Sequence, residues 1–149
     1  MRLNLRPITR DNWRQIAMLA VNENQTSFVE NNSYSLAQSG LEPEWISVGL
    51  YDGDTAVGYA MHGVDIENGQ VWLDRFMIDG RHQGRGYAKR FLAMLLTDMS
   101  NRYACNRIYL SIHPENELAR SLYARMGFYA SKEMDGAEEV MILDRKPSM

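Results

Sequence analysis

The residues most suggestive of chemistry form a glycine-rich turn, Gln83-Gly84-Arg85-Gly86-Tyr87-Ala88. Gly84 and Gly86 lack a Cβ atom, so the backbone there can adopt conformations that other residues resist. An apolar segment typical of a strand, residues 71–78, precedes the turn, and residues 88–99 follow with helical periodicity. Because a helix N-terminus presents unpaired N–H groups and the positive end of its dipole, this order suits a pyrophosphate. The same pattern also serves as a plain connector between a strand and a helix.

Two further polar residues interrupt apolar patterns. Asp74 lies in the middle of the apolar strand, where an unpaired carboxylate is costly to bury. It is a candidate for proton transfer or for a salt bridge with a neighbouring basic residue. Arg75 is expected to point to the opposite face, because side chains alternate along a strand, and so to be a poor partner for Asp74. Tyr123 falls on the apolar side of a helix, and its spacing alone favours a place in the core.

Composition limits the classes of protein that fit. The 149 residues are 45% hydrophobic and 23% charged, which indicates one globular domain, residues 1–149, with a substantial core. The net charge of -3 argues against a nucleic-acid binder that relies on a broad basic surface. No segment is apolar for long enough to span a bilayer, and residues 1–11 lack a signal-peptide pattern. We therefore expect a cytoplasmic protein without a nucleic-acid or membrane partner.

The cysteine and histidine content predicts neither a disulfide nor a metal site. Cys105 is the single cysteine, which excludes an intrachain disulfide and suits a reducing compartment. The three histidines show no metal-ligand spacing. We expect Cys105 to be a half-buried structural residue rather than a nucleophile.

The elements that must position these residues alternate between strands and helices. Strands are predicted at residues 3–8, 45–51, 56–64, 71–78, 107–112, 129–134 and 138–143. A helix capped by Thr9, with Trp13, Ile16, Ala17 and Ala20 on one face, is expected first. Others are expected within residues 25–38, with a break near Asn31-Asn32, at 88–99, and from Pro114 and Asn116 to Gly127. The last of these is expected to carry its apolar residues on one side, namely Leu118, Ala119, Leu122, Tyr123 and Met126. This order predicts a mixed α/β sheet with helices on its faces.

Two motifs in order resemble those of the GNAT-type, acetyl-CoA-dependent N-acetyltransferases. Residues 83–88 match the family's Gln/Arg-x-x-Gly-x-Gly/Ala signature, and Asn116, Tyr123 and Gly127-Phe128 resemble its second hallmark. The order of elements agrees from end to end. The resemblance implies a single domain with a central, mostly antiparallel mixed sheet flanked by helices. Residues 71–76, 107–112 and the Asn24-Gln25 region further resemble bacterial spermine/spermidine acetyltransferases of the diamine type.

The resemblance implies transfer of an acetyl group from acetyl-CoA to a primary amine, by direct attack in a ternary complex. A polyamine, spermidine or spermine, is the favoured acceptor. In the family, the strand before the signature diverges from its neighbour and pairs with the pantetheine arm, while main-chain N–H groups hold the pyrophosphate. The implied cofactor-binding residues are Phe76, Met77, Ile78, Gln83, Gly84, Arg85, Gly86, Tyr87, Ala88, Lys89 and Asn116. No metal is implied, and a homodimer is expected because the family often forms one.

The proton-transfer roles follow from the same resemblance. Tyr123 is the candidate general acid, because a phenol with a pKa of ~10 holds its proton at neutral pH and can deliver it to a leaving thiolate. Asp74 is the candidate acceptor of the ammonium proton, through water, or a group that fixes the cationic amine. Asn116 caps its helix and contacts the cofactor or substrate. Candidate substrate-binding residues are Glu23, Glu30, Trp45 and Asp74, for which a solvated acid or a core aromatic remains the alternative.

Rival functions stay open at this point. The acceptor could be an aminoglycoside, an amino acid or a protein N-terminus rather than a polyamine. A non-catalytic CoA-binding sensor is the rival of another class, and the presence of Tyr123 and Asp74 argues against it. A nucleotide-binding kinase lacks the Gly-Lys-Ser/Thr ending that its phosphate loop needs.

Overall fold

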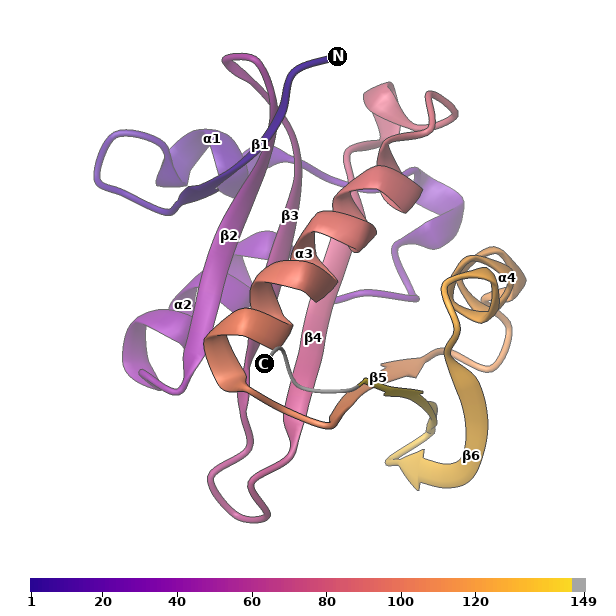
Figure 1. Cartoon of the computed structure of the whole chain (residues 1–149). Helices are drawn as coiled ribbons and strands as arrows, with labels where there is room; N and C mark the ends of the chain where they lie inside the picture. Colours follow the sequence, from indigo (N-terminus) through magenta and orange to yellow (C-terminus); the bar gives the residue numbers. More distant parts are fainter. Residues whose placement is uncertain (146–149) are drawn as a thin grey trace.

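Apolar runs separated by glycine turns form one sheet with helices on both faces (Figure 1). The computed structural model describes residues 1–145. The strands are β1 (Leu3–Pro7), β2 (Trp45–Asp52), β3 (Thr55–Val64), β4 (Val71–Ile78), β5 (Arg107–Ile112), β6 (Tyr129–Asp135) and β7 (Glu138–Asp144). The α-helices are α1 (Trp13–Met18), α2 (Asn32–Leu41), α3 (Tyr87–Tyr103) and α4 (Glu117–Arg125), with 3-10 turns η1 (Glu23–Gln25) and η2 (Gly80–His82).

The sheet is mixed and mostly antiparallel, as predicted. Its strand order is β1-β2-β3-β4-β5-β7-β6, and β4 and β5 form the parallel pair. The turns between β2 and β3, β3 and β4, and β6 and β7 contain Gly53, Gly69 and Gly136, all with positive φ. Because glycine adopts positive φ without a Cβ clash, these residues allow the chain to reverse between consecutive strands.

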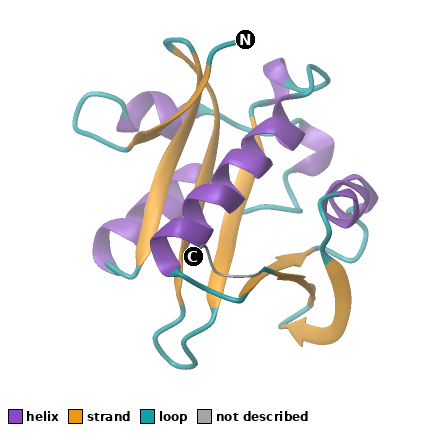
Figure 2. Ribbon diagram, in the orientation of Figure 1, coloured by secondary structure: helices purple, strands orange, loops and turns teal. Residues whose placement is uncertain are grey.

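The parallel pair at the centre of the sheet opens along its length (Figure 2). Trp72 of β4 and Tyr109 of β5 form the one registered pair between these strands. Beyond it, the rest of β4, up to Ile78, runs without ladder pairing to β5. The two strands therefore diverge, and the later backbone groups of β4 face a gap in the sheet.

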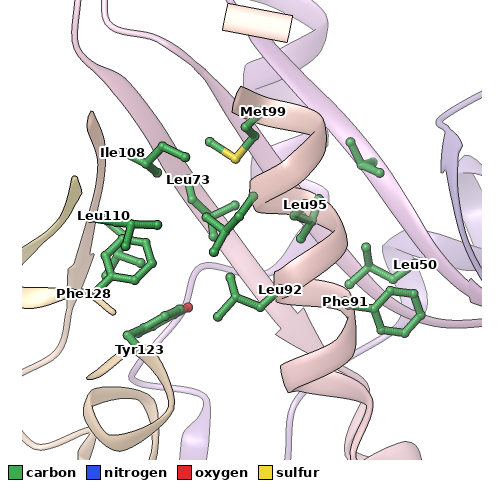
Figure 3. Close-up of a cluster of buried hydrophobic side chains, with 14 of the residues drawn as sticks. Leu50, Leu73, Phe91, Leu92, Leu95, Met99, Ile108, Leu110, Tyr123 and Phe128 are labelled. Carbon is green, nitrogen blue, oxygen red and sulfur yellow. The ribbon is translucent and has the colours of Figure 1, made fainter. Parts of the chain in front are cut away.

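Buried side chains fix both strands. Phe91, Leu92, Leu95 and Met99 of α3 are fully buried and pack in one cluster with Ile108 and Leu110 of β5 and with Leu73 of β4 (Figure 3). Burial of one such side chain stabilises the fold by about 1.5–3 kcal/mol. On the opposite face, α1 and α2 cover a second cluster that includes Ile16, Leu19 and Tyr59. The divergence of β4 from β5 is thus held by a packed core.

Two predictions about helices were wrong. The first α-helix begins after Asn12, so Thr9 is not its N-cap residue. Thr9 caps the turn just before the helix, where its hydroxyl oxygen accepts a hydrogen bond from the N–H of Asp11 and its own N–H donates to Oδ1 of Asn12. The helix ends at Met18 because Leu19 adopts extended dihedrals, so Ala20 lies outside it and Trp13 is 42% exposed. The fourth helix begins after Asn116, as predicted, but Leu118 is 75% exposed rather than part of its buried face.

Among residues 1–145, no helix combines the length and apolarity needed to cross a membrane.

Candidate active site

The gap beside β4 forms a groove of about 490 Å³, called here the β4 groove. Its walls come from the end of β4, the glycine turn, the start of α3, α4 and the segment around η1. Residues from the predicted cofactor set that line it are Phe76, Met77, Ile78, Gln83, Gly84, Gly86, Tyr87, Ala88, Lys89 and Asn116. The structure therefore gathers ten of those eleven residues around one groove, with Arg85 exposed in the turn between them.

The glycine turn presents backbone N–H groups at one end of this groove. Gly84 and Gly86 have φ values of +79° and +82°, and an added Cβ would meet nothing within 4 Å at either position. Glycine is therefore required by the backbone conformation rather than by close packing. Gly86 is the N-cap of α3 and no side chain caps this helix, so its first N–H groups are available to an anion.

The side chains of the turn are engaged elsewhere. The amide nitrogen of Gln83 donates to the Ile78 carbonyl and to Oε1 of Gln25, both at 2.9 Å, which ties the turn to β4 and η1. The Tyr87 hydroxyl donates to Oδ2 of Asp52 at 2.7 Å. These two residues can therefore meet a phosphate only through their main chain. Lys89 and Arg125 bring positive charge to the groove.

A second cavity of about 350 Å³, called here the carboxylate cavity, adjoins the groove. Three carboxylates line it: Glu30 before α2, Asp74 in β4 and Glu138 in β7. The two spaces share the wall residues Phe28, Val29, Phe76, Asn116, Ala119 and Tyr123. A molecule in the groove and a second in the cavity would consequently meet at this shared wall.

Tyr123 lies at that junction. Its ring is buried in the main core and packs edge-on against Phe128, with ring centroids 5.6 Å apart (Figure 3). No other residue in the described part of the chain shares a hydrogen bond with its hydroxyl, and burial raises its pKa. The phenol is therefore protonated at neutral pH and free to donate. The side-chain oxygen of Asn116 accepts from the Ala119 N–H at 3.2 Å, which caps α4 and fixes the start of the helix that carries Tyr123.

Asp74 and Arg75 pair directly, and the prediction that they point to opposite faces was wrong. In the ladder between β3 and β4, Met61 faces Arg75 and His62 faces Leu73, which leaves Asp74 as the extra residue of a bulge. A bulge interrupts side-chain alternation. Both side chains line the carboxylate cavity, with Nη1 of Arg75 2.9 Å from Oδ2 of Asp74. Burial raises the pKa of Asp74, and Arg75 opposes that rise.

Two of the four predicted substrate-binding residues lie together, and the other two lie elsewhere. Glu30 and Asp74 line the carboxylate cavity. Trp45 instead lines a different space, of about 600 Å³, together with Trp13 of α1 and Leu36 of α2. Glu23 is exposed on η1 and lines neither the β4 groove nor the carboxylate cavity.

Several residues that line the groove or the cavity were not predicted from the sequence. Phe28 and Val29, in the segment after η1, line both the groove and the cavity, although their spacing indicated only short helices. Glu138 is the first residue of β7, and nothing in its local sequence distinguishes it from a solvated acid. The exposure of Leu118, an apolar residue on the groove side of α4, is a signal that becomes visible only once the structure is known.

Within residues 1–145, no three His, Cys, Asp or Glu side chains cluster as metal ligands.

The comparisons with known proteins agree with this architecture. The acetyltransferase (GNAT) family profile matches residues 5–128. A spermine/spermidine N(1)-acetyltransferase of Bacillus subtilis is 40% identical over 149 residues, covering 95% of this chain and 98% of the relative. An uncharacterised N-acetyltransferase of Methanocaldococcus jannaschii is 29% identical over 113 residues, covering 72% of this chain and 70% of the relative.

Solved structures show the same fold at low sequence identity. A spermidine N-acetyltransferase from Vibrio cholerae, in complex with CoA and spermine, superposes with a TM-score of 0.76 at 21% identity and covers 96% of this chain and 95% of its own. A PaiA N-acetyltransferase from Thermoplasma acidophilum, in complex with coenzyme A, superposes with a TM-score of 0.70 at 14% identity. The match covers 97% of this chain and 100% of the Thermoplasma chain. With the family profile and the Bacillus relative, these findings lead to one conclusion: the chain belongs to the acetyltransferase (GNAT) family.

Proposed function

We propose that this N-acetyltransferase transfers the acetyl group of acetyl-CoA to a primary amine of a polyamine, spermidine or spermine, in a ternary complex. The observation that carries the proposal is the meeting of two unlike spaces at Tyr123. One has apolar walls and ends at an uncapped helix N-terminus, and the other is lined by carboxylates. This arrangement suits an anionic thioester on one side and a cationic acceptor on the other.

The β4 groove fits acetyl-CoA, which supplies an activated acyl group and a thiolate as leaving group. The main chain of residues 83–88 would hold the pyrophosphate, since the first N–H groups of α3 have no side-chain cap. Phe76, Met77 and Ile78 would meet the pantetheine arm with backbone groups that β5 leaves unpaired. Lys89 would add positive charge, and Asn116 lies at the wall where the arm would end.

Asp74 and Tyr123 would manage the protons. A polyamine nitrogen is mostly protonated near neutral pH, so Asp74 would first accept one proton from the ammonium group, directly or through water. The freed lone pair forms the new N–C bond as the C–S bond breaks. Tyr123 gives its proton to the departing sulfur and recovers one from the newly acylated nitrogen. The proton on Asp74 then passes to solvent, which balances the reaction.

Carboxylates would select the cationic acceptor. Asp74, Glu30 and Glu138 bring three negative charges to a cavity in which Arg75 supplies one positive charge. Glu138 is held in place because its Oε1 accepts a hydrogen bond of 2.9 Å from Ser111. A diamine or longer polyamine offers several ammonium groups to such a wall. The Bacillus relative, whose name is that of a spermine/spermidine N(1)-acetyltransferase, supports this acceptor class.

A panel of amines tests the proposal by the rate of CoA release. We expect spermidine and spermine to give the highest kcat/KM, above a monoamine, an aminoglycoside, an amino acid and a peptide with a free N-terminus. Turnover of another amine without any polyamine turnover would reject the acceptor. If the chain binds acetyl-CoA but releases no CoA with any acceptor, the non-catalytic sensor becomes the better hypothesis.

The organisation of the protein is part of the same proposal. We propose one domain over residues 1–149, which the single seven-stranded sheet supports. We further propose a cytoplasmic homodimer whose partners are small molecules rather than nucleic acid or membrane. The net charge of -3 supports the exclusion of a nucleic-acid partner. Light scattering coupled to size exclusion measures the oligomeric state.

A further inference from the structure

The contact between Asp74 and Arg75 is built by the bulge in β4. Neighbouring residues on a regular strand point to opposite faces, but the bulge leaves Asp74 without a partner in β3 and turns both side chains toward the carboxylate cavity. Nη1 of Arg75 donates to Oδ2 of Asp74 at 2.9 Å and to the Asp74 carbonyl oxygen at 2.8 Å. One nitrogen of the guanidinium therefore donates hydrogen bonds to both the side chain and the main chain of Asp74.

The hydrogen bonds from Arg75 involve only one of the two carboxylate oxygens of Asp74. Within residues 1–145, no hydrogen bond joins Oδ1 of Asp74 to another residue. The two side chains are 20% and 21% exposed, so the pair is mostly desolvated but still open to the cavity. Because charge-assisted hydrogen bonds are strong in such surroundings, Arg75 restricts the rotation of the carboxylate.

Arg75 opposes the negative charges that surround Asp74. Burial and the neighbouring carboxylates Asp135, Glu138 and Asp65 all raise the pKa of Asp74, and Glu30 lines the same cavity. Arg75 is the charged neighbour that lowers it. A protonated carboxyl group cannot accept a proton from an ammonium group, so the loss of Arg75 would extend to higher pH the range in which Asp74 cannot act as a base.

We propose that Arg75 is a positioning residue for acetyl transfer, which holds Asp74 by Oδ2 so that Oδ1 is presented, as a carboxylate, to the acceptor nitrogen in the cavity. The inference rests on the proposed role of Asp74 as proton acceptor. In the step concerned, one proton moves from the ammonium nitrogen to Oδ1, and the nitrogen keeps the electron pair that forms the N–C bond. Arg75 itself exchanges no proton.

The test compares Arg75→Gln and Arg75→Lys with the wild type in the pH dependence of kcat/KM for spermidine. Removal of an adjacent opposite charge raises the pKa of an aspartate by about 1–3 units. We expect the acidic limb of the Arg75→Gln profile to move to higher pH by about one unit or more, which is about a tenfold loss on that limb. Activity should recover toward wild type at high pH, and Arg75→Lys should shift less, because it keeps the charge.

Arg107→Gln is the matched control, since Arg107 makes an exposed ion pair of 2.8 Å with Asp144 and lines neither the groove nor the cavity. Its profile should match the wild type. Thermal unfolding and CoA titration of each variant confirm folding and an intact β4 groove. A loss in Arg75→Gln that is equal at every pH, or no loss at all, would overturn the proposal.

Asp74→Asn separates this inference from the proposed function. If Asp74→Asn loses activity while Arg75→Gln behaves like Arg107→Gln, the base assignment stands and the role of Arg75 is refuted. If Asp74→Asn is as active as the wild type, the base assignment fails and the role of Arg75 fails with it. If the wild type acetylates only a non-polyamine, that amine replaces spermidine in the assay and the test of Arg75 keeps its meaning.

Discussion

Removal of one oxygen atom, by Tyr123→Phe, separates the chemical role of Tyr123 from its structural role. The ring packs against Phe128 in the main core, and no hydrogen bond ties the hydroxyl to another described residue. Phenylalanine keeps the ring and its contacts. The substitution should therefore change the free energy of unfolding by less than about 1 kcal/mol, because no hydrogen-bond partner is left unsatisfied.

The expected loss of activity is far larger. A positioned general acid contributes about 10²–10⁴ to the rate, which corresponds to about 2.7–5.4 kcal/mol of transition-state stabilisation. We expect kcat for CoA release with spermidine to fall by that factor, while the affinity for CoA stays within about twofold of the wild type. The measurements are steady-state kinetics, calorimetric titration with CoA and urea unfolding at neutral pH.

Tyr103→Phe is the control with the opposite pattern. The Tyr103 hydroxyl lies 2.7 Å from Nδ1 of buried His62, and Tyr103 lines neither the β4 groove nor the carboxylate cavity. Its loss leaves a buried ring nitrogen unsatisfied, so stability should fall by about 1–3 kcal/mol with kcat unchanged. The reasoning about Tyr123 is refuted if Tyr123→Phe retains wild-type kcat, or if it destabilises the protein as much as Tyr103→Phe does.

Three further predictions concern other parts of the molecule. Gly86→Ala should strain the turn by about 1–2 kcal/mol, because alanine resists a positive φ, and so weaken CoA binding by about fivefold to thirtyfold. Gly69→Ala, with a similar φ in an open hairpin, should leave binding unchanged. Glu138→Gln should raise KM for spermine several-fold more than KM for a monoamine; an equal effect on both would contradict a selective role. Burial lowers the pKa of His62 from 6.5 to about 4, so the unfolded chain binds more protons in that window. The free energy of unfolding should therefore fall by up to about 3 kcal/mol as the pH drops from 6.5 to 4, which urea unfolding measures. If a His62→Leu variant shows the same dependence of this free energy on pH, His62 is not its cause.

The sequence located the elements of the site because their signals are local. The bounds of β4 and β5 agree with the apolar runs at residues 71–78 and 107–112. Asn116 caps α4, and Gly127, with a φ of +102°, ends it, as their residue types predict. Such features depend on a few neighbouring residues, so the order of strands and helices could be predicted from the chain alone.

The parts that could not be predicted depend on contacts between distant segments. The bulge at Asp74 is a property of the register between β4 and β3. The assumption that side chains alternate strictly along β4 therefore predicted the wrong face for Arg75. Trp45 and Asp74 were grouped as substrate residues by type, but β2 and β4 carry them to different cavities. Glu138 enters the site because β7 lies beside β5, a pairing that no local pattern encodes.

Calorimetric titration of the purified protein with acetyl-CoA tests the central claim most directly, namely that the gap between β4 and β5 is a cosubstrate site. We expect saturable binding of one molecule per chain, with a dissociation constant between about 1 μM and 1 mM. Binding should be weakened by Gly86→Ala and unchanged in Gly69→Ala. No detectable binding of acetyl-CoA or CoA, or binding that Gly86→Ala leaves untouched, would contradict the account.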